Sequence, residues 1–226
     1  MKPQSEGAGE PLSIDVVSDV VCPWCFIGKR KLEAALAENP GAPVDIRWRP
    51  FQLDPTIPPG GIPRRQYLEK KFGAARIDEI HTRLTEAGRE VGIEFALDRI
   101  AVSPNTLDAH RLIRWAQTTG HQGAVKEALL RAYFLEGRDI GDRAVLLEVA
   151  AASGLDAALV TRLFAEGADI QAVTDEIASA VRLGVTGVPF FIFANKFAVP
   201  GAQSAEVLAG AITKARAEAA QPTGLA

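Results

Sequence analysis

Strand-like sequence occurs only near the two ends of this chain, and the long stretch between them has helical periodicity. Residues 14–18 are rich in β-branched side chains, and residues 44–49 alternate apolar and charged side chains as a half-buried strand does. Residues 190–193 and 197–199 form a second pair of strand-like segments. Strands from both ends can share one sheet, with the middle of the chain inserted as a lid. No repeat of fixed period is visible, so a repeat solenoid is not supported.

The spacing of the end segments predicts how their strands pair. Between the first two strands, apolar residues recur at helical spacing after Pro23, and Asn39-Pro40-Gly41 ends that helix. A strand–helix–strand unit favours a parallel, right-handed crossover. The last two strands are separated only by residues 194–196, so they must pair antiparallel. A final helix is predicted from residue 204 to about 220.

The middle of the chain is predicted to be all helical. It follows a break rich in proline and glycine at residues 55–63 and extends to Gly184. We expect Asp142, Asp156 and Asp169 to act as N-caps. The predicted helices span residues 64–72, 77–91, 107–118, 123–136, 143–152, 157–165 and 170–182. The fold class is therefore α/β, in the order βαβ, helical block, ββα.

Composition narrows the functional classes. The 226 residues include 25 Lys and Arg and 28 Asp and Glu, a formal charge of −3, which gives none of the basic excess typical of nucleic-acid binders. Two cysteines are too few for a disulfide-stapled scaffold. The first 13 residues lack an apolar signal-peptide run, and stretches such as 188–194 are far shorter than the roughly 20 residues that cross a bilayer. We expect a cytoplasmic protein without nucleic-acid or membrane partners.

The two cysteines occur together in the motif Cys22-Pro23-Trp24-Cys25, where the first strand passes into the first helix. A cysteine that caps a helix faces free backbone N–H groups and the positive end of the helix dipole, and both stabilise the thiolate. Pro23 suits the first helical position. Cys25 lies on the same helix face, within reach of Cys22. The motif predicts that Cys22 attacks a disulfide and that Cys25 resolves the mixed disulfide.

A zinc site and a pair of purely structural cysteines are the two competing interpretations of this motif. Zinc usually takes four ligands, one cysteine pair supplies two, and His81, His110 and His121 have no ligand-like spacing, so we predict no metal site. Two structural cysteines would explain neither the Pro-Trp dipeptide nor the position at a helix start. Pro189 lies just before the third predicted strand. Without Cys22 and Cys25 elsewhere in the chain, it would be interpreted as an ordinary trans proline that opens a strand.

Four motifs together resemble the thioredoxin fold, and specifically the DsbA-like family, whose helical domain is inserted between βαβ and ββα halves. The match extends over about residues 13–218 and is most similar to the cytoplasmic FrnE-type subgroup. The motifs are residues 18–28, 48–53, 103–112 and 187–191. The resemblance implies a thioredoxin-like domain of residues 13–62 and 185–220, with an inserted helical domain of residues 63–184. Residues 1–12 are polar and interrupted by glycine and proline, so we expect a flexible tail there, and residues 221–226 are expected to form a C-terminal tail.

The resemblance also implies the site and its partners. Cys22 is the attacking and Cys25 the resolving thiol, Pro189 is a cis-proline facing the disulfide, and the Val188 backbone pairs with an extended substrate. The other expected substrate-binding residues are Pro23, Trp24 and Gly187. No bound cofactor is expected beyond the redox-active Cys22–Cys25 disulfide. The implied partners are protein or small-molecule thiols and disulfides, with glutathione or thioredoxin as candidates for recycling the pair.

Two alternative functions remain open. The first is a glutathione-dependent isomerase or transferase of the 2-hydroxychromene-2-carboxylate isomerase or kappa-class type. Relatives of that kind carry serine at the attacking position, and this chain departs from them by having both cysteines. The second is a redox-responsive holdase chaperone whose helical block holds clients.

Three further positions have two interpretations each. Asp19 is a candidate proton acceptor during exchange, or it satisfies backbone groups of the turn. His110 is a candidate cleft residue above the thiols, or a hydrogen-bonded helix histidine. The basic run at residues 29–31 is expected to be a solvated helix face, with a secondary possibility that it lowers the thiol pKa.

Overall fold

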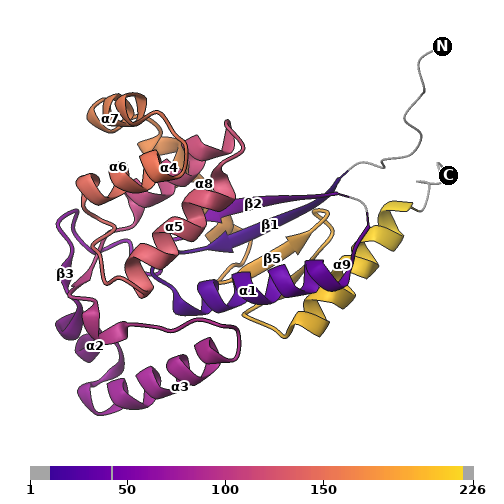
Figure 1. Cartoon of the computed structure of the whole chain (residues 1–226), viewed down its shortest axis with the longest axis horizontal. Coiled ribbons are helices and arrows are strands. Elements are labelled where there is room, and N and C mark those ends of the chain that lie inside the picture. Colours follow the sequence, from indigo (N-terminus) through magenta and orange to yellow (C-terminus); the bar gives the residue numbers. More distant parts are fainter. Residues whose placement is uncertain (1–10, 42, 221–226) are drawn as a thin grey trace.

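A four-stranded mixed sheet organises the computed structural model, which describes residues 11–41 and 43–220 (Figure 1). β1 (Leu12–Ser18) pairs in parallel with β2 (Val44–Pro50) and antiparallel with β5 (Phe190–Phe193). β6 (Phe197–Pro200) pairs antiparallel with β5, which gives the order β2-β1-β5-β6. The predicted parallel crossover and the predicted hairpin are both confirmed. Strands from the two ends of the chain share one sheet, as the sequence predicted.

Helices cover the sheet, and β1 is buried from both sides. α1 (Pro23–Glu38) and α9 (Ala205–Ala220) pack against each other along one face (Figure 1). Val16 belongs to the apolar cluster on that face, whereas its neighbour Val17 packs with Ala180 and Val185 in a second cluster. Successive residues of a strand point to opposite faces, so the apolar run in β1 is what a strand covered on both sides requires.

Seven helices lie between β2 and β5, and every one was predicted to within two residues at each end. They are α2 (Arg64–Phe72), α3 (Ile77–Arg89), α4 (Leu107–Gln117), α5 (Gln122–Phe134), α6 (Arg143–Ala152), α7 (Ala157–Ala165) and α8 (Ile170–Arg182). Short 3₁₀ turns occupy Ala74–Arg76 and Leu97–Arg99. α2 and α3 lie together, apart from the group formed by α4 to α8 (Figure 1).

Two short strands were missed by the sequence analysis, which found only helices in this region. β3 (Ile62–Pro63) pairs antiparallel with β4 (Val102–Ser103). Strands of two residues are too short to show an alternating pattern. They tie the start of α2 to the segment that precedes α4.

Of the three expected aspartate caps, one was wrong. Asp142 and Asp156 accept hydrogen bonds from backbone N–H groups in the first turns of α6 and α7, as predicted. Asp169 occupies the N-cap position of α8 with a left-handed backbone (φ 59°), but its side chain makes no capping hydrogen bond. Its carboxylate instead accepts a hydrogen bond from Trp115 Nε1 at 2.8 Å, because the fold brings α4 beside the start of α8.

Most of the tails expected at 1–12 and 221–226 falls outside the described residues, which exclude 1–10 and 221–226. Leu12 already belongs to β1, so this strand begins two residues before the predicted start at Ile14.

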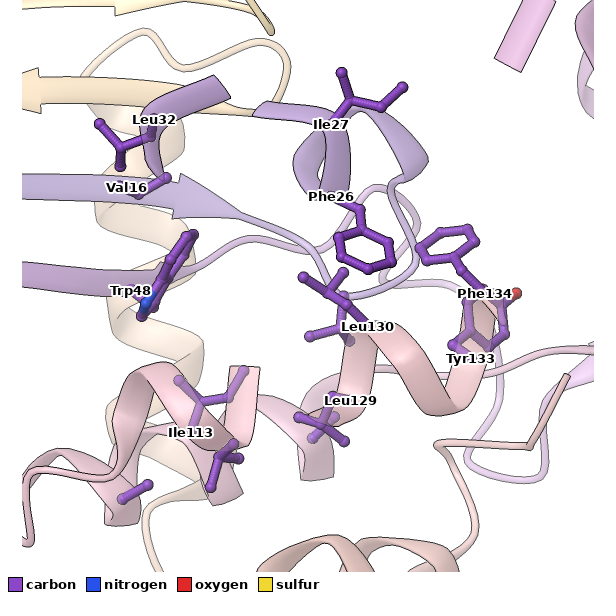
Figure 2. Close-up of a cluster of buried hydrophobic side chains, with 14 of the residues drawn as sticks. Val16, Phe26, Ile27, Leu32, Trp48, Ile113, Leu129, Leu130, Tyr133 and Phe134 are labelled. Atoms are coloured by element: carbon purple, nitrogen blue, oxygen red, sulfur yellow. The ribbon is translucent and has the colours of Figure 1, made fainter. Parts of the chain in front are cut away.

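One apolar core extends from the sheet into the helical region. Phe26 on α1 lies 6.3 Å from Phe134 on α5 and 6.1 Å from Phe95, measured between ring centroids. Figure 2 shows the Phe26 ring next to the Phe134 ring, with Phe26 pointing toward Leu130. Aromatic pairs at these separations add stabilisation beyond the area they bury. The helix that carries the cysteines is therefore packed directly onto the helical region.

Candidate active site

Cys22 is the N-cap of α1, as the sequence predicted. Its backbone is extended (φ −92°, ψ 112°), and Pro23 opens the helix. The Cys25 N–H donates to the Cys22 carbonyl at 3.0 Å and closes the first turn. The local sequence explains this geometry. Proline is unfavourable inside a helix but well suited to its first position, so α1 begins at Pro23 and Cys22 becomes its cap.

Both thiols are free and buried. The exposed fraction of Cys22 is 4%, and that of Cys25 is 1%. Cys22 nevertheless lines a cavity of about 360 Å³, together with Trp24, Gly187 and Val188. Cys22 thus borders the cavity, whereas Cys25 is not among the residues that line it.

The two thiols differ in acidity. The hydrogen bond from the Cys25 thiol lowers the pKa of Cys22, and it outweighs the opposing effect of burial. Backbone N–H groups of Cys25 and Trp24 lower the pKa of Cys22 further. Burial raises the pKa of Cys25 well above its usual range, and the neighbouring Cys22 sulfur raises it more. Cys22 is therefore the more acidic thiol of the reduced pair, and Cys25 keeps its proton to higher pH.

The loop before β5 lies next to Cys22. Its Val188–Pro189 peptide bond is cis, and the Cys22 thiol donates to the Val188 carbonyl oxygen at 3.5 Å. Pro189 is buried, Val188 is half-buried, and Gly187 is exposed. The structure thus brings together the two motifs that the sequence analysis singled out at opposite ends of the chain.

Gly28 on α1 leaves room for the Pro189 ring. A Cβ atom at Gly28 would lie 2.8 Å from Pro189 Cγ and 3.3 Å from Phe191 Cζ. We expect Gly28→Ala to destabilise the fold by about 1–3 kcal/mol, the usual cost of overpacking a core. Urea denaturation measures this change.

Gly210 on α9 is the matched control, because a Cβ there would meet nothing within 4 Å. Gly210→Ala is expected to stabilise the protein by up to about 1 kcal/mol, since alanine favours a helix over glycine. A Gly28→Ala variant as stable as the unchanged protein would contradict the close approach of α1 to the Pro189 loop.

Asp19 and His110 form a buried pair beside the cavity. The Asp19 carboxylate accepts the Leu53 N–H at 2.8 Å and lies 3.3 Å from His110 Nε2. Burial opposes its ionisation, but the hydrogen bond and charge of His110 lower the pKa of Asp19 overall. Asp19 therefore satisfies a backbone group, but that of Leu53 rather than one of its own turn. Its role as a proton acceptor stays a prediction.

His110 does not line the cavity that contains Cys22, which corrects its placement as a cleft residue. Its side chain is 2% exposed and lies behind Asp19, with Nε2 also 2.9 Å from the Phe51 carbonyl oxygen. It is the hydrogen-bonded helix histidine that was the alternative interpretation. The burial of this ring follows from the packing of α4 against the sheet, which the sequence pattern around His110 did not specify.

Lys126 on α5 is a residue of the site that the sequence analysis missed. It is fully buried, and its Nζ has no hydrogen-bond partner within the described residues. Burial lowers the pKa of Lys126, while the charges of Cys25, Asp19 and Cys22 act in the opposite direction. In turn, the charge of Lys126 lowers the pKa of Cys25. A signal did exist, because a lysine occupies the apolar stripe of this helix, at helical spacing from Leu129, Leu130 and Tyr133.

The basic run at residues 29–31 is not the solvated face that was expected. Lys29 is 6% exposed and pairs with Glu127 at 2.7 Å. Arg30 pairs with the same carboxylate. These ion pairs join α1 to α5. The charged face of α1 is therefore covered by the helical region instead of facing solvent.

Within residues 11–41 and 43–220, no three His, Cys, Asp or Glu side chains gather as metal ligands. No helix in those ranges combines the length and the apolar character needed to span a bilayer.

Comparison with known proteins identifies the family. An uncharacterized protein of Bacillus subtilis (strain 168), YwbO, is 29% identical over 209 residues, which cover 88% of this chain and 95% of the relative. The crystal structure of the probable DsbA oxidoreductase SCO1869 from Streptomyces coelicolor superposes with a TM-score of 0.86 at 33% identity, covering 95% of this chain and 94% of that one. A structure of 2-hydroxychromene-2-carboxylate isomerase shares the fold with a TM-score of 0.69 at 15% identity, covering 91% and 97%.

A protein-family model also matches most of this chain. Residues 13–213 match the family described as DSBA-like thioredoxin domain. This range includes both cysteines, the helical region and the loop around Pro189, and the thioredoxin-like fold with a helical insertion agrees with it. The chain therefore belongs to the DSBA-like thioredoxin domain family.

Proposed function

We propose that this protein is a thiol–disulfide oxidoreductase of the FrnE-type subgroup, with Cys22 as nucleophile and Cys25 as resolving thiol. The observation that carries the proposal is the opposite shift of the two pKa values at a sulfur that opens into a cavity. The pKa of Cys22 is lowered by the hydrogen bond from Cys25, and the pKa of Cys25 is raised by burial. The thiolate is the nucleophile in disulfide exchange, so the reactive form is favoured at the accessible position.

The reaction takes place in two exchanges. The Cys22 thiolate attacks one sulfur of a substrate disulfide, forms a mixed disulfide and releases a substrate thiolate. Cys25 then loses its proton and attacks Cys22 Sγ, which releases the second substrate thiolate. The products are a reduced substrate and the Cys22–Cys25 disulfide, and the reverse sequence oxidises a substrate dithiol.

The residues that border the cavity beside Cys22 are the candidates for substrate contacts. Trp24 is 38% exposed and borders the cavity with Pro23, Gly187 and Val188. We assign these residues and Pro189 to substrate binding. The substrates are protein or small-molecule disulfides. Glutathione or thioredoxin recycles the Cys22–Cys25 pair, and the reaction occurs in the cytoplasm. We also retain the division into a thioredoxin-like domain (13–62 and 185–220) and an inserted helical domain (63–184).

Redox titration of the purified protein against glutathione tests the proposal. Mass spectrometry should detect the loss of two hydrogen atoms as the Cys22–Cys25 disulfide forms, and the midpoint gives the reduction potential. The same preparation should catalyse dithiothreitol-dependent reduction of insulin. Two thiols that stay reduced at every glutathione ratio, with no insulin reduction, would overturn the assignment.

A glutathione-dependent isomerase or transferase is the second candidate. Its support is the cavity, which is in the range of small-molecule sites, and the fold shared with 2-hydroxychromene-2-carboxylate isomerase. This function requires saturable glutathione binding and turnover that survives replacement of Cys25. No feature of the described residues favours the third hypothesis, a holdase chaperone.

A further inference from the structure

The cavity beside Cys22 has a second wall that disulfide exchange alone does not require. Cys22, Trp24 and Val188 line one part of the cavity, and side chains of α2, α3 and the end of α5 line another part. Much of the lining is apolar. The main apolar side chains are Val21, Leu53, Ile57, Leu68, Ile80 and Leu84. A largely apolar cavity of about 360 Å³ next to a reactive sulfur is suited to a small molecule.

Arg64 places a permanent positive charge in that apolar wall. The side chain lies at the start of α2 and is 9% exposed. Its Nη1 donates to Tyr133 Oη at 2.9 Å, and the buried Nε has no hydrogen-bond partner within the described residues. In the same part of the chain Arg64 forms no salt bridge. Buried charges in proteins are normally paired, because an isolated one is costly.

The neighbours of Arg64 do not supply the missing negative charge. Burial raises the pKa of Tyr133 to about 12, so its hydroxyl stays neutral. Burial and the charge of Arg64 lower the pKa of His81, whose Nε2 is also buried without a hydrogen-bond partner in the described residues. His81 therefore offers a neutral hydrogen-bonding group on the same wall.

The two acidic residues of the cavity are occupied elsewhere. Asp19 accepts hydrogen bonds from Leu53 and His110. Asp54 accepts the N–H and the hydroxyl of Thr56. A second cation, the exposed Lys71, lies among the lining residues. The unsatisfied groups of the cavity are thus cationic or neutral, and they suit an anion.

We propose that this cavity binds a small disulfide or thiol with an apolar body and a carboxylate, which pairs with Arg64 while the sulfur reaches Cys22. The inference rests on the proposed function and specifies its substrate class. A guanidinium can hold a carboxylate through two parallel charge-assisted hydrogen bonds. Attack by the Cys22 thiolate on such a disulfide forms a mixed disulfide and releases one carboxylate-bearing thiolate. Cys25 then displaces the second, and its proton passes to the departing thiolate or to solvent.

Two aromatic disulfides that differ in charge provide the test. Dithiobis(nitrobenzoate) carries a carboxylate on each ring, and dithiodipyridine is neutral. Stopped-flow absorbance measures the reaction of each with the fully reduced protein at subsaturating concentration. Arg64→Gln should slow the carboxylate disulfide by about tenfold relative to the neutral one, equivalent to about 1.4 kcal/mol.

Arg65→Gln is the matched control, since it removes the same charge from the neighbouring position. Arg65 has a side chain that is 87% exposed and pairs with Glu69. This variant should change neither rate. An equal slowing of the carboxylate disulfide in both variants would attribute the effect to surface charge and overturn the inference.

A measurement on the unchanged protein covers the case in which Arg64→Gln fails to fold. Naphthoate should protect Cys22 from iodoacetamide at concentrations where naphthamide does not, and equal protection would overturn the inference. The experiments distinguish failure of the proposed disulfide exchange from failure of the carboxylate site at Arg64. If neither disulfide reacts with any protein, the proposed function fails. If Arg64→Gln affects both disulfides equally, only the carboxylate site fails.

Discussion

Replacing Cys22 with serine is expected to abolish disulfide exchange, leaving only the uncatalysed rate. A serine hydroxyl cannot form a disulfide, so neither the mixed disulfide nor the Cys22–Cys25 disulfide can exist in Cys22→Ser. Loss of a catalytic nucleophile elsewhere costs on the order of a millionfold in rate, so the residual should be indistinguishable from a blank. Dithiothreitol-dependent insulin reduction, followed by turbidity, measures the loss.

Cys25→Ser is the informative partner of that variant, because it removes only the second step. The first attack should still occur, and the mixed disulfide at Cys22 should accumulate after a single turnover. Without Cys25, the pKa of Cys22 loses the largest influence that lowers it, the hydrogen bond from the Cys25 thiol. The first step should therefore become slower near neutral pH and recover as the pH rises. Undiminished turnover in Cys22→Ser, or a mixed disulfide trapped at residue 25, would contradict the assignment of roles.

Local sequence signals were sufficient for most of the fold. The β-branched run of β1, the break after α1 and the short turn between β5 and β6 each depend on residues close together in the chain. The position of Cys22 at a helix start is equally local, since Pro23 follows it directly. These features could be predicted because secondary-structure periodicity and capping act over a few residues.

The residues that surround the thiols could not be predicted in the same way. Cys22 contacts Val188, which is 166 positions away in the chain. Lys126 reaches the site because α5 packs beside the start of α1, and Arg64 reaches it because α2 lines the cavity that contains Cys22. That packing depends on long-range apolar contacts such as Phe26 with Phe134. The β3–β4 pairing was also missed, because each strand has only two residues and the partners are far apart in the chain.

Lys126→Met is expected to slow the second exchange by about tenfold, because the pKa of Cys25 rises when the positive charge of Lys126 is removed. Lys126 lies in the interior with Cys25, where its positive charge favours the Cys25 thiolate. Without that charge, less of Cys25 is ionised at a given pH. The rate at which a preformed mixed disulfide at Cys22 releases its thiol should fall, and its pH profile should move to higher pH. Rapid quenching followed by mass spectrometry measures this rate.

Stability separates this electrostatic role from a structural one. Because burial lowers the pKa of Lys126 in the folded protein, protonation favours the unfolded chain. This penalty grows as the pH falls below the unfolded value of about 10.4, and it is complete once the pH lies below the folded pKa. Methionine has a similar shape without charge, so Lys126→Met should melt at the same temperature or higher while it reacts more slowly.

The control for Lys126→Met is Lys31→Met, which removes a lysine that hydrogen-bonds the Ala202 carbonyl. It should leave the release rate and its pH profile unchanged. A slower and less stable Lys126→Met protein would point to damaged packing. A Lys126→Met protein that releases thiol at the unchanged rate would remove Lys126 from the mechanism. A more stable but slower variant would mean that the buried charge is retained for the chemistry of Cys25, since the fold is better without it.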